Sequence, residues 1–493
     1  MKDINIRKKL VSLAVASVFS GGAMLAAAPA HALNVSQDNV GQVLLFPYYT
    51  VKNGLDTLHY VVNTSPNTVV FKVRYREALN SREVRDFNVV LSPNDVWTAV
   101  VTKDALGNGA VLRTFDNTCT SPILPASGTM SGAREINFTN ALFSGNFKDG
   151  GSEDMSRVQE GYFEIISMGM STRSTDTSTN TLEYNAKHVN GVPRSCTKVD
   201  ELFLDTATNL SYQATPENVL KGHSTLIDVA TGKAIDASPT TLENWITTGN
   251  AIAAPGDLTP SLADGDAVGN AYRLVDGALQ TISYTAAEDG VSDLLRNGSV
   301  INQYATGTNA ATSWVVTFPT KHHYTDAYTA DVGPTVEDGT ATGGFSEWFY
   351  NGTGDGRSCD NVSIVLYNRE EGSVTPGGTS FSPRPVSSSV ELCYEVNVIN
   401  FNNSNVFGSG VNRLGVDTSG VGQAGWAELK FTEASATTLG AEASATTLGA
   451  EASATTLGGL PVIGFAATMR DSGNATVNYG SSEPHAYVTR TLP

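Results

Sequence analysis

Four cysteines are the side chains with the plainest chemistry in this chain of 493 residues. Cys119, Cys196, Cys359 and Cys393 form an even set, and an even set in an oxidising compartment favours two disulfides. Three pairings are open. Sequence order favours Cys119–Cys196 together with Cys359–Cys393.

The second of these pairs also follows from strand parity. Cys359 has the parity of the polar residue Asn361, and Cys393 has the parity of Glu391 and Glu395. If the two segments are paired strands, both cysteines point to their polar sides. We therefore expect the Cys359–Cys393 disulfide to lie at the surface, outside the core.

The segment that looks most like a metal site contains His322 and His323, with Asp326 three residues further on. Adjacent residues of a strand point to opposite faces, so two such rings rarely reach one ion. Other ligands do not surround them at suitable spacing. We interpret the pair as a polar strand end.

Three aspartates lie in loops that resemble fragments of calcium sites. Asp264 and Asp266 flank Gly265, and Asp355 lies in a run of Asn and Gly. Neither loop has the twelve-residue spacing that ends in Glu. A structural calcium ion in an acidic secreted protein is one interpretation, ordinary turn chemistry is the other, and no further cofactor is expected.

Catalytic patterns do not emerge from the sequence. Gly408-Ser409-Gly410 lacks the strand–turn–helix context of a serine nucleophile, and the facing carboxylates of a glycosidase cannot be located without a family pattern. The aromatic residues Tyr48 and Tyr49, and those at Trp348-Phe349-Tyr350, could stack on sugars, but a place in the core or at a sheet edge is the favoured interpretation. We predict a protein that is not an enzyme.

The first 32 residues have the features of a secretory signal peptide. Lys2, Arg7, Lys8 and Lys9 precede an apolar run, which closes at Ala30-His31-Ala32. The mature chain is expected to begin near Leu33 and to cross the inner membrane by the general secretory route. Its destination is then the cell surface, the extracellular space or the periplasm.

The net charge of the chain is −18, and loss of the signal makes it more acidic. Nucleic acids and anionic membranes are therefore excluded as expected partners, because both need a basic patch. After the signal, the sequence has no apolar run of 18 residues, so no transmembrane helix is expected.

Alternation with a period of two is clearest from Val69 to Arg76. The apolar residues Val69, Phe71, Val73 and Tyr75 alternate with basic ones, which predicts a strand with one buried and one wet face. Similar short runs, separated by turn signals, recur along the chain. They predict a mainly β fold with immunoglobulin-like antiparallel β-sandwich modules, long polar loops and a few short helices.

The expected organisation has four parts. They are a signal peptide at 1–32, N-terminal sandwich strands at 33–104, a mixed region with short helices at 105–310, and a β-rich region at 311–493. Short helices are expected at 240–248 and 286–296, and a continuous strand at 390–398.

A tandem repeat interrupts the last region at 433–459. Glu-Ala-Ser-Ala-Thr-Thr-Leu-Gly-Ala occurs twice and then returns with a final Gly. A calcium-binding β-roll would need Gly-Gly-x-Gly-x-Asp, which these units lack. We interpret the repeat as a duplication in an exposed loop between two strands.

Four segments resemble a group of uncharacterised secreted proteins from Gram-negative bacteria. They are Gly41–Thr50, Leu79–Trp97, Tyr162–Met168 and Leu460–Phe465. The resemblance is scattered along most of the chain. It implies an envelope or extracellular location and brings no activity and no site residues.

These observations favour a secreted structural protein, such as a subunit of a matrix, filament, layer or adhesin. Self-association, or contact with other envelope or matrix components, is the expected partnership. A protein that binds a glycan or a small ligand outside the cytoplasm is the alternative. A secreted hydrolase is a third, less favoured interpretation.

Overall fold

The computed structural model describes most of the chain beyond its first 31 residues. The described ranges are 32–171, 179–204, 214–275, 278–326, 339–349, 356–375, 390–431, 458–471 and 478–489. Residues Ala32–Pro493 belong to one compact unit. The predicted signal peptide lies outside the described residues except for Ala32, which is buried. The predicted mainly β fold with few helices is confirmed.

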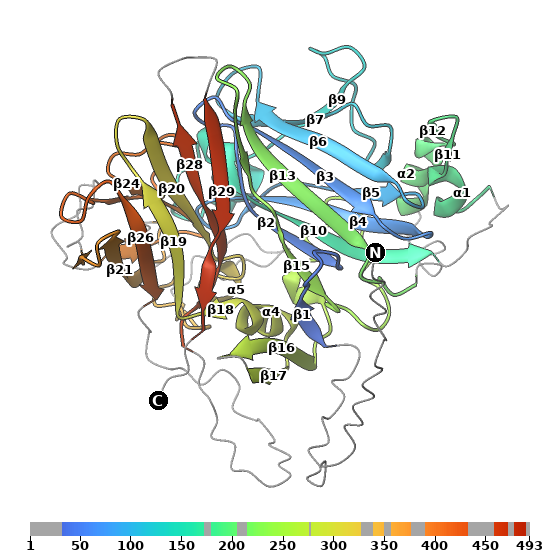
Figure 1. Cartoon of the computed structure of the whole chain (residues 1–493). Helices are drawn as coiled ribbons and strands as arrows, with labels where there is room; N and C mark the ends of the chain where they lie inside the picture. Colours follow the sequence, from blue (N-terminus) through green and yellow to red (C-terminus); the bar gives the residue numbers. More distant parts are fainter. Residues whose placement is uncertain are drawn as a thin grey trace, which may run out of the picture. The chain divides into compact units, whose positions relative to one another are not determined.

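The largest sheet, sheet 1, has nine strands (Figure 1). In spatial order they are β17 (Ala278–Tyr284), β16 (Gly269–Val275), β1 (Leu33–Val35), β15 (Thr240–Glu243), β2 (Val43–Thr50), β10 (Glu160–Ser171), β4 (Thr68–Glu77), β5 (Glu83–Leu91) and β8 (Cys119–Ser121). Neighbours are antiparallel, apart from the parallel pair β1 and β16.

Sheet 2 has six strands and packs on one face of sheet 1. In spatial order they are β14 (Lys233–Asp236), β13 (Leu220–Asp228), β3 (Asp56–Asn63), β6 (Val96–Lys103), β7 (Ala110–Thr114) and β9 (Arg134–Asn137). Phe71 and Phe163 of sheet 1 share one apolar cluster with Trp97 and Leu112 of sheet 2. Sheets 1 and 2 therefore form a β-sandwich, here called the first sandwich.

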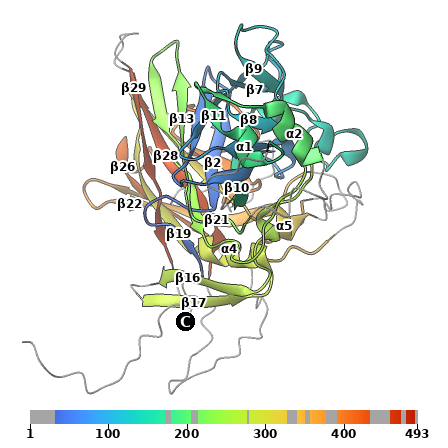
Figure 2. The same cartoon turned by 90° about the vertical axis from the view of Figure 1, so that its right-hand side faces the viewer.

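The other face of sheet 1 is also covered, which explains why β2, β4 and β10 are buried along their whole length. At one end, α1 (Leu182–Ala186) and α2 (Cys196–Leu204) cover Val70 and Met168. At the other end, α4 (Ala287–Leu295) packs on Val43 and Leu45 (Figure 2). Strands buried on both faces tend to read as continuous apolar runs, and β2 does so.

The second sandwich consists of sheets 3 and 4. Sheet 3 contains β22 (Ser373–Val374), β21 (Asp360–Asn368), β26 (Ala424–Phe431), β19 (Ser299–Ala305) and β30 (Ala486–Val488), with β23 (Val390–Leu392) beside β21. Sheet 4 contains β25 (Arg413–Val416), β24 (Val396–Phe401), β20 (Ala310–Thr317), β28 (Ile463–Arg470) and β29 (Tyr479–Pro484). Its core joins Tyr304 and Leu366 of sheet 3 to Trp314 and Phe401 of sheet 4.

Smaller elements complete the described part. They are the pairs β11 (His188–Val189) with β12 (Val192–Pro193) and β18 (Arg296–Asn297) with β27 (Leu460–Pro461), the helix α5 (His322–Thr325), and the 3-10 turns η1 (Ala141–Phe143), η2 (Gly145–Phe147), η3 (Met155–Gln159) and η5 (Leu262–Asp264).

The two sandwiches contact each other in two places: through an apolar cluster that they share, and between the edge strands β14 and β29. Tyr48 and Tyr162 of sheet 1 pack with Val315 and Val396 of sheet 4. The edge strands β14 and β29 also contact each other. A Cβ at Gly480 of β29 would lie 2.3 Å from the carbonyl oxygen of Ala234, so glycine permits this close approach of the two backbones.

One of the two predicted helices is confirmed and the other is wrong. The prediction at 286–296 corresponds to α4, which buries Val291 and Leu294. The prediction at 240–248 fails, because Thr240–Glu243 form β15 and pair with β2 inside sheet 1. Tertiary pairing of the β-branched threonines overrides the helical spacing of the following apolar residues.

The predicted strand at 390–398 is also wrong as a single element. Its halves, β23 and β24, belong to different sheets. Between them, the side chain of Asn397 bonds the backbone of Tyr394 in both directions. This local bonding breaks the ladder and sends the chain across to the other sheet.

The predicted middle region supplies strands to sheets 1 and 2 of the first sandwich, including β13 and β16. The likeness to immunoglobulin modules stays a prediction. Among the described residues, no helix combines the length and apolar character needed to cross a membrane.

Candidate functional site

The densest group of buried ionisable side chains lies where β4 ends. The carboxylate of Glu77 accepts hydrogen bonds from the backbone N–H groups of Leu79, Asn80 and Arg82. It therefore holds the turn that joins β4 to β5. The side chain of Glu77 is fully buried.

Arg157, from η3, binds two carboxylates at once. Its Nε and one terminal nitrogen donate to Glu77 at 2.7 and 2.9 Å. Its two terminal nitrogens also donate to Asp149 at 2.8 and 2.6 Å. The planar guanidinium suits this double fork, because its five donors are held in a fixed geometry.

The group continues into the second sandwich. Arg82 contacts Asp149 at 3.5 Å and Asp326 at 2.6 Å, and Asn80 donates to the same two carboxylates. Asp326 directly follows α5. We call Glu77, Asn80, Arg82, Asp149, Arg157 and Asp326 the junction cluster, since it ties the β4–β5 turn to residues of the second sandwich.

The charges of the junction cluster are mutually stabilised. Burial alone would raise the pKa of Asp149, but the hydrogen bonds and charge of Arg157 outweigh it and lower this pKa. Burial alone would lower the pKa of Arg157, but Glu77 and Asp149 outweigh it and raise this pKa. A carboxylate with a lowered pKa is a poor general base at neutral pH.

A second row of charges follows the outer face of β4. Lys72 pairs with Asp86 at 3.0 Å and Arg74 with Glu83 at 2.8 Å. The sequence predicts that this face is wet, and that prediction is wrong, since Lys72 and Arg74 are fully buried. The segment around Asp257 covers them, and its carbonyl oxygen accepts from both side chains.

Burial dominates the electrostatics of this row. It raises the pKa of Glu83 to about 7 against the opposing charge of Arg74, and it lowers the pKa of Lys72. Such shifts occur in catalytic sites and in structural ion-pair networks alike. In this row, each ionisable side chain is paired with another charged side chain of the same row.

The two adjacent histidines lie beside the junction cluster, on α5. Their ring centroids lie 4.1 Å apart with the ring planes tilted by 35°, and His322 Nδ1 lies 3.6 Å from Glu395 Oε1. The interpretation of a strand end is therefore wrong, because a helical turn brings both rings together. Burial lowers the pKa of His322 and lowers that of His323 to about 3, so both rings are neutral at physiological pH.

The histidines do not assemble a metal site with the neighbouring carboxylate. Within the described residues, the one group of metal-binding side chains with mutually close ligand atoms is Cys359, Glu391 and Cys393. Its two cysteines are joined as a disulfide, which removes the thiolates that a metal would need.

A third group of charges ties the two sandwiches at another point. Glu160, at the start of β10, accepts from Lys52 at 2.5 Å, Tyr48 at 2.8 Å and Arg413 at 2.8 Å. Burial would raise the pKa of Glu160, but Arg413 and Lys52 outweigh it and lower this pKa to about 2.

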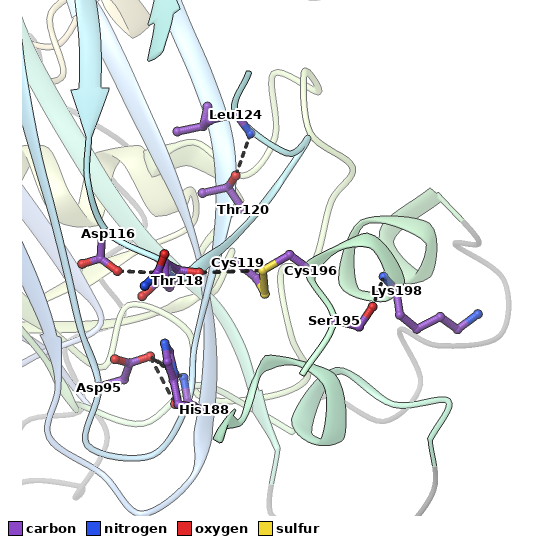
Figure 3. Close-up of a disulfide and its surroundings, with 12 residues drawn as sticks. Asp95, Asp116, Thr118, Cys119, Thr120, Leu124, His188, Ser195, Cys196 and Lys198 are labelled. Carbon is purple, nitrogen blue, oxygen red and sulfur yellow. Dashed lines mark hydrogen bonds and ion pairs between the residues drawn. A yellow bond between two sulfur atoms is a disulfide. The ribbon is translucent and has the colours of Figure 1, made fainter. Parts of the chain in front are cut away.

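Both disulfides favoured by sequence order are present. Cys119 of β8 is bonded to Cys196, the first residue of α2 (Figure 3). This bond ties the pair of helices to the edge of sheet 1. Nearby, His188 Nδ1 lies 3.4 Å from Asp95 (Figure 3).

The Cys359–Cys393 bond joins two paired strands as expected, because β21 pairs with β23. Its predicted surface position is wrong for Cys359, whose exposed fraction is 4%. The residues on either side of Cys359 are buried as well: Ser358 and Asp360 both accept from the buried Lys321, and the backbone N–H of Cys359 donates to Glu347.

Two of the three calcium candidates serve as local caps. Asp264 accepts from the backbone and side chain of Ser261, and Asp266 accepts from the backbone and side chain of Thr247. Asp355 lies outside the described residues. The three aspartates are not placed as one site, and calcium binding stays a prediction.

A hollow among the described residues is largely open to solvent and has a volume of about 400 Å³. It is lined by Arg85, Pro125, Ala126, Glu135, Ile136 and Asn137. Glu135 is its one carboxylate. Hydrogen bonds from Ser127 and Arg113 lower the pKa of Glu135, so this residue is poorly suited to proton transfer at neutral pH.

The aromatic residues considered for sugar binding are mostly in the core. Tyr48 and Tyr49 are fully buried and Phe349 nearly so, whereas Tyr350 lies outside the described residues. A pair that the sequence analysis missed is partly exposed. Trp426 of β26 stacks on Tyr367 of β21 at 3.9 Å.

The candidate site is therefore a set of buried, paired charges whose geometry serves cohesion. Comparisons with family models, curated proteins and solved structures found no match. Sequence reasoning missed the junction cluster, whose members come from three segments of the chain, at 77–82, 149–157 and 326. A signal was available only for a separate buried pair: Glu164 lies among the apolar residues of β10, and a charge in such a place needs a buried partner, here Arg76.

Proposed function

We propose that this chain is a secreted, non-enzymatic structural protein of the cell surface or the extracellular space. It works as a self-associating subunit of a matrix, layer or filament. The observation that carries the proposal is that the buried ionisable residues pair with one another and hold parts of the fold together. The pairs Arg82–Asp326 of the junction cluster and Glu160–Arg413 join the two sandwiches to each other.

The disulfides support an oxidising location. Two disulfides are typical of proteins that function outside the cytoplasm. The leader-like residues 1–32 and the resemblance to secreted envelope proteins of Gram-negative bacteria point the same way. These features support export, and cell fractionation determines the final location of the protein.

Cell fractionation with imaging of released material tests the proposal. The source cells are separated into periplasm, outer surface and medium, and the protein is followed with an antibody. We expect it in surface or released assemblies. A protein confined to the periplasm as a monomer would contradict the proposal.

The stacked pair of Trp426 and Tyr367 supports a second candidate function, glycan binding outside the cytoplasm. Trp426 has an exposed fraction of 38%, and exposed rings on a sheet face suit contacts with sugars. A glycan array with wild type and Trp426→Ala tests it. Loss of a specific signal in the variant would favour this function, and a blank array for wild type would count against it.

A further inference from the structure

Two cysteines and one carboxylate converge where β21 and β23 pair. Cys359 directly precedes β21 and Cys393 directly follows β23, and the antiparallel register places Asp360 opposite Leu392. Cys359 and Cys393 therefore lie opposite each other across the two strands. Glu391 lies two residues before Cys393, so alternation along the strand directs its side chain to the same side. The two sulfur atoms and one carboxylate oxygen of Glu391 all lie within 4.8 Å of one another.

The backbone around both cysteines is held by bonds that do not involve the sulfur atoms. The N–H of Cys359 donates to the carboxylate of Glu347 at 3.0 Å, and the N–H of Ser358 donates to the carbonyl oxygen of Cys393 at 3.1 Å. The buried Lys321 donates to the carbonyl oxygen of Ser358 at 2.6 Å. We therefore expect both cysteines to stay opposite each other after the S–S bond is cleaved.

Reduction converts this group into a set of three ligands. A dithiol gives two electrons and two protons to the S–S bond and becomes a disulfide itself, which leaves two thiols on the protein. A divalent cation then replaces the two thiol protons, which pass to solvent, and binds both thiolates and the carboxylate. Thiolates favour Zn²⁺ over the hard cations Ca²⁺ and Mg²⁺. Three protein ligands leave the fourth position of a tetrahedral Zn²⁺ site to water.

We propose that Cys359, Cys393 and Glu391 form a binding site for Zn²⁺ when their disulfide is reduced. In the oxidised protein, the S–S bond joins β21 to β23. In the reduced protein, the metal ion joins the same two strands, so that their connection is kept under reducing conditions. This inference goes beyond the proposed function and does not depend on it.

The other disulfide provides an internal comparison. Cys119 lies in β8 and Cys196 begins α2 (Figure 3). Within the part of the chain that the structure describes, these two cysteines belong to no group of three metal-binding side chains. Reduction of their bond therefore gives two thiols without the carboxylate, and we expect the metal at only one of the two cysteine pairs.

Cobalt binding tests the inference, because Co²⁺ can replace Zn²⁺ and absorbs strongly in the near ultraviolet when thiolates bind it. The mature protein is titrated with Co²⁺ in its oxidised form and after reduction with a phosphine under argon. Circular dichroism follows the β structure in both forms. We expect a single Co²⁺ per chain in the reduced protein, displaced by added Zn²⁺, and no thiolate absorption in the oxidised protein.

Two double variants identify the cysteines that bind the metal. Cys359→Ser/Cys393→Ser should abolish the thiolate absorption of Co²⁺ in the reduced protein. Cys119→Ser/Cys196→Ser should retain this absorption, because the second cysteine pair is unchanged in it.

A pair of glutamate variants tests the carboxylate ligand. Glu391→Gln should lower the affinity for Co²⁺ at least about tenfold, since it removes a ligand. Glu370→Gln makes the same change of charge at an exposed residue of the turn after β21 and should leave the affinity unchanged.

Four outcomes would overturn the inference. They are a reduced wild type that binds no Co²⁺, loss of its β structure on reduction, thiolate absorption that persists in Cys359→Ser/Cys393→Ser, and equal affinities in the two glutamate variants. None of them bears on surface assembly, so the proposed function stands or falls by its own test.

Discussion

Glu160 of β10 and Arg413 of β25 form a buried ion pair between the two sandwiches, with 2.8 Å between the carboxylate and the guanidinium. Lys52 and Tyr48 donate to the same carboxylate. Glu160 thus has three donors from elements that are distant in the chain. The pair fixes sheet 4 against sheet 1 at a point where apolar packing by Tyr48 and Phe407 is also present.

Replacing Arg413 by methionine should lower the free energy of unfolding by about 3 kcal/mol. The substitution removes one of two cations that stabilise a buried carboxylate, and breaking a buried pair typically costs about 3–5 kcal/mol. Urea denaturation at neutral pH measures the change. Arg113→Met is the control, since the Arg113–Glu135 pair is more exposed and should be worth less than about 1 kcal/mol. Equal losses in the two variants would contradict this role of Glu160.

Arg157→Lys tests the junction cluster. Lysine retains the charge but cannot donate two parallel bonds to each of Glu77 and Asp149. We expect a loss of about 3 kcal/mol, and faster hydrogen exchange in the turn after β4. Lys198→Ala, which removes the exposed pair with Glu201, should change stability by less than about 0.5 kcal/mol. A wild-type stability for Arg157→Lys would show that charge alone suffices.

Removing the Cys119–Cys196 bond by a double serine substitution should destabilise the protein by about 4 kcal/mol. Loop-closure entropy for a separation of 77 residues sets this magnitude. Hydrogen exchange should increase first in α1 and α2, because the bond ties them to β8. Calorimetry under oxidising conditions measures the loss. Unchanged exchange in both helices would contradict the tethering role of this bond.

The strands with clear alternation were predictable from sequence, and the layering around them was not. The inward residues Phe71 and Tyr75 lie in the core as the period of two requires. Lys72 and Arg74 also read as a solvated face, because basic residues are rarely fully buried. Their covering comes from the segment around Asp257, more than 180 residues away in the chain, and no local pattern reports such a contact.

The candidate site was likewise predictable from the sequence only in part. Both disulfides followed from the number and order of the cysteines, since these depend on composition and spacing. The junction cluster combines residues of η3, the β4–β5 turn and the end of α5, and its pairing depends on how two sandwiches dock. The interruption between β23 and β24 was also hidden from the sequence, because Asn397 and Tyr394 form a local turn inside an alternating run.

Buried histidines should make the protein less stable as the pH falls below about 6.5. Burial lowers the pKa of His59 and His323 to about 3 and that of His485 to about 4. From about pH 6.5 to about pH 4, the unfolded chain therefore binds protons that the folded chain does not, at a cost of up to about 1.4 kcal/mol per pH unit for each ring. Glu83 and Glu395 have the opposite sign, because burial raises the pKa of Glu83 to about 7 and that of Glu395 well above its ordinary value, so both reduce stability as the pH rises above about 4.5.

Urea unfolding at pH 7, 5.5 and 4.5 measures the slope of the free energy of unfolding against pH. We expect the effect of the buried histidines to exceed the opposing effect of the buried carboxyl groups. His485→Gln should flatten the slope by about one proton, because the ring of His485 bonds the carbonyl oxygen of Val315 in its neutral form. The control is His223→Gln, which makes the same substitution at a partly exposed ring. Stability that is flat or rises as the pH falls from 6.5 to 4.5 would contradict the prediction.

Deleting one nine-residue unit of the repeat at 433–459 should leave the melting temperature nearly unchanged. The repeat lies outside the described residues except for Gly458 and Gly459, and it connects β26, which ends at Phe431, to β27, which begins at Leu460. Shortening a loop of this length changes its closure entropy by only about 0.3 kcal/mol, which corresponds to a shift of about 1 °C. Calorimetry of the deletion variant is compared with a variant in which the same unit is replaced by nine Gly and Ser residues. A drop of several degrees in both variants would show that the unit packs on the sandwich, and would contradict the interpretation of an exposed loop.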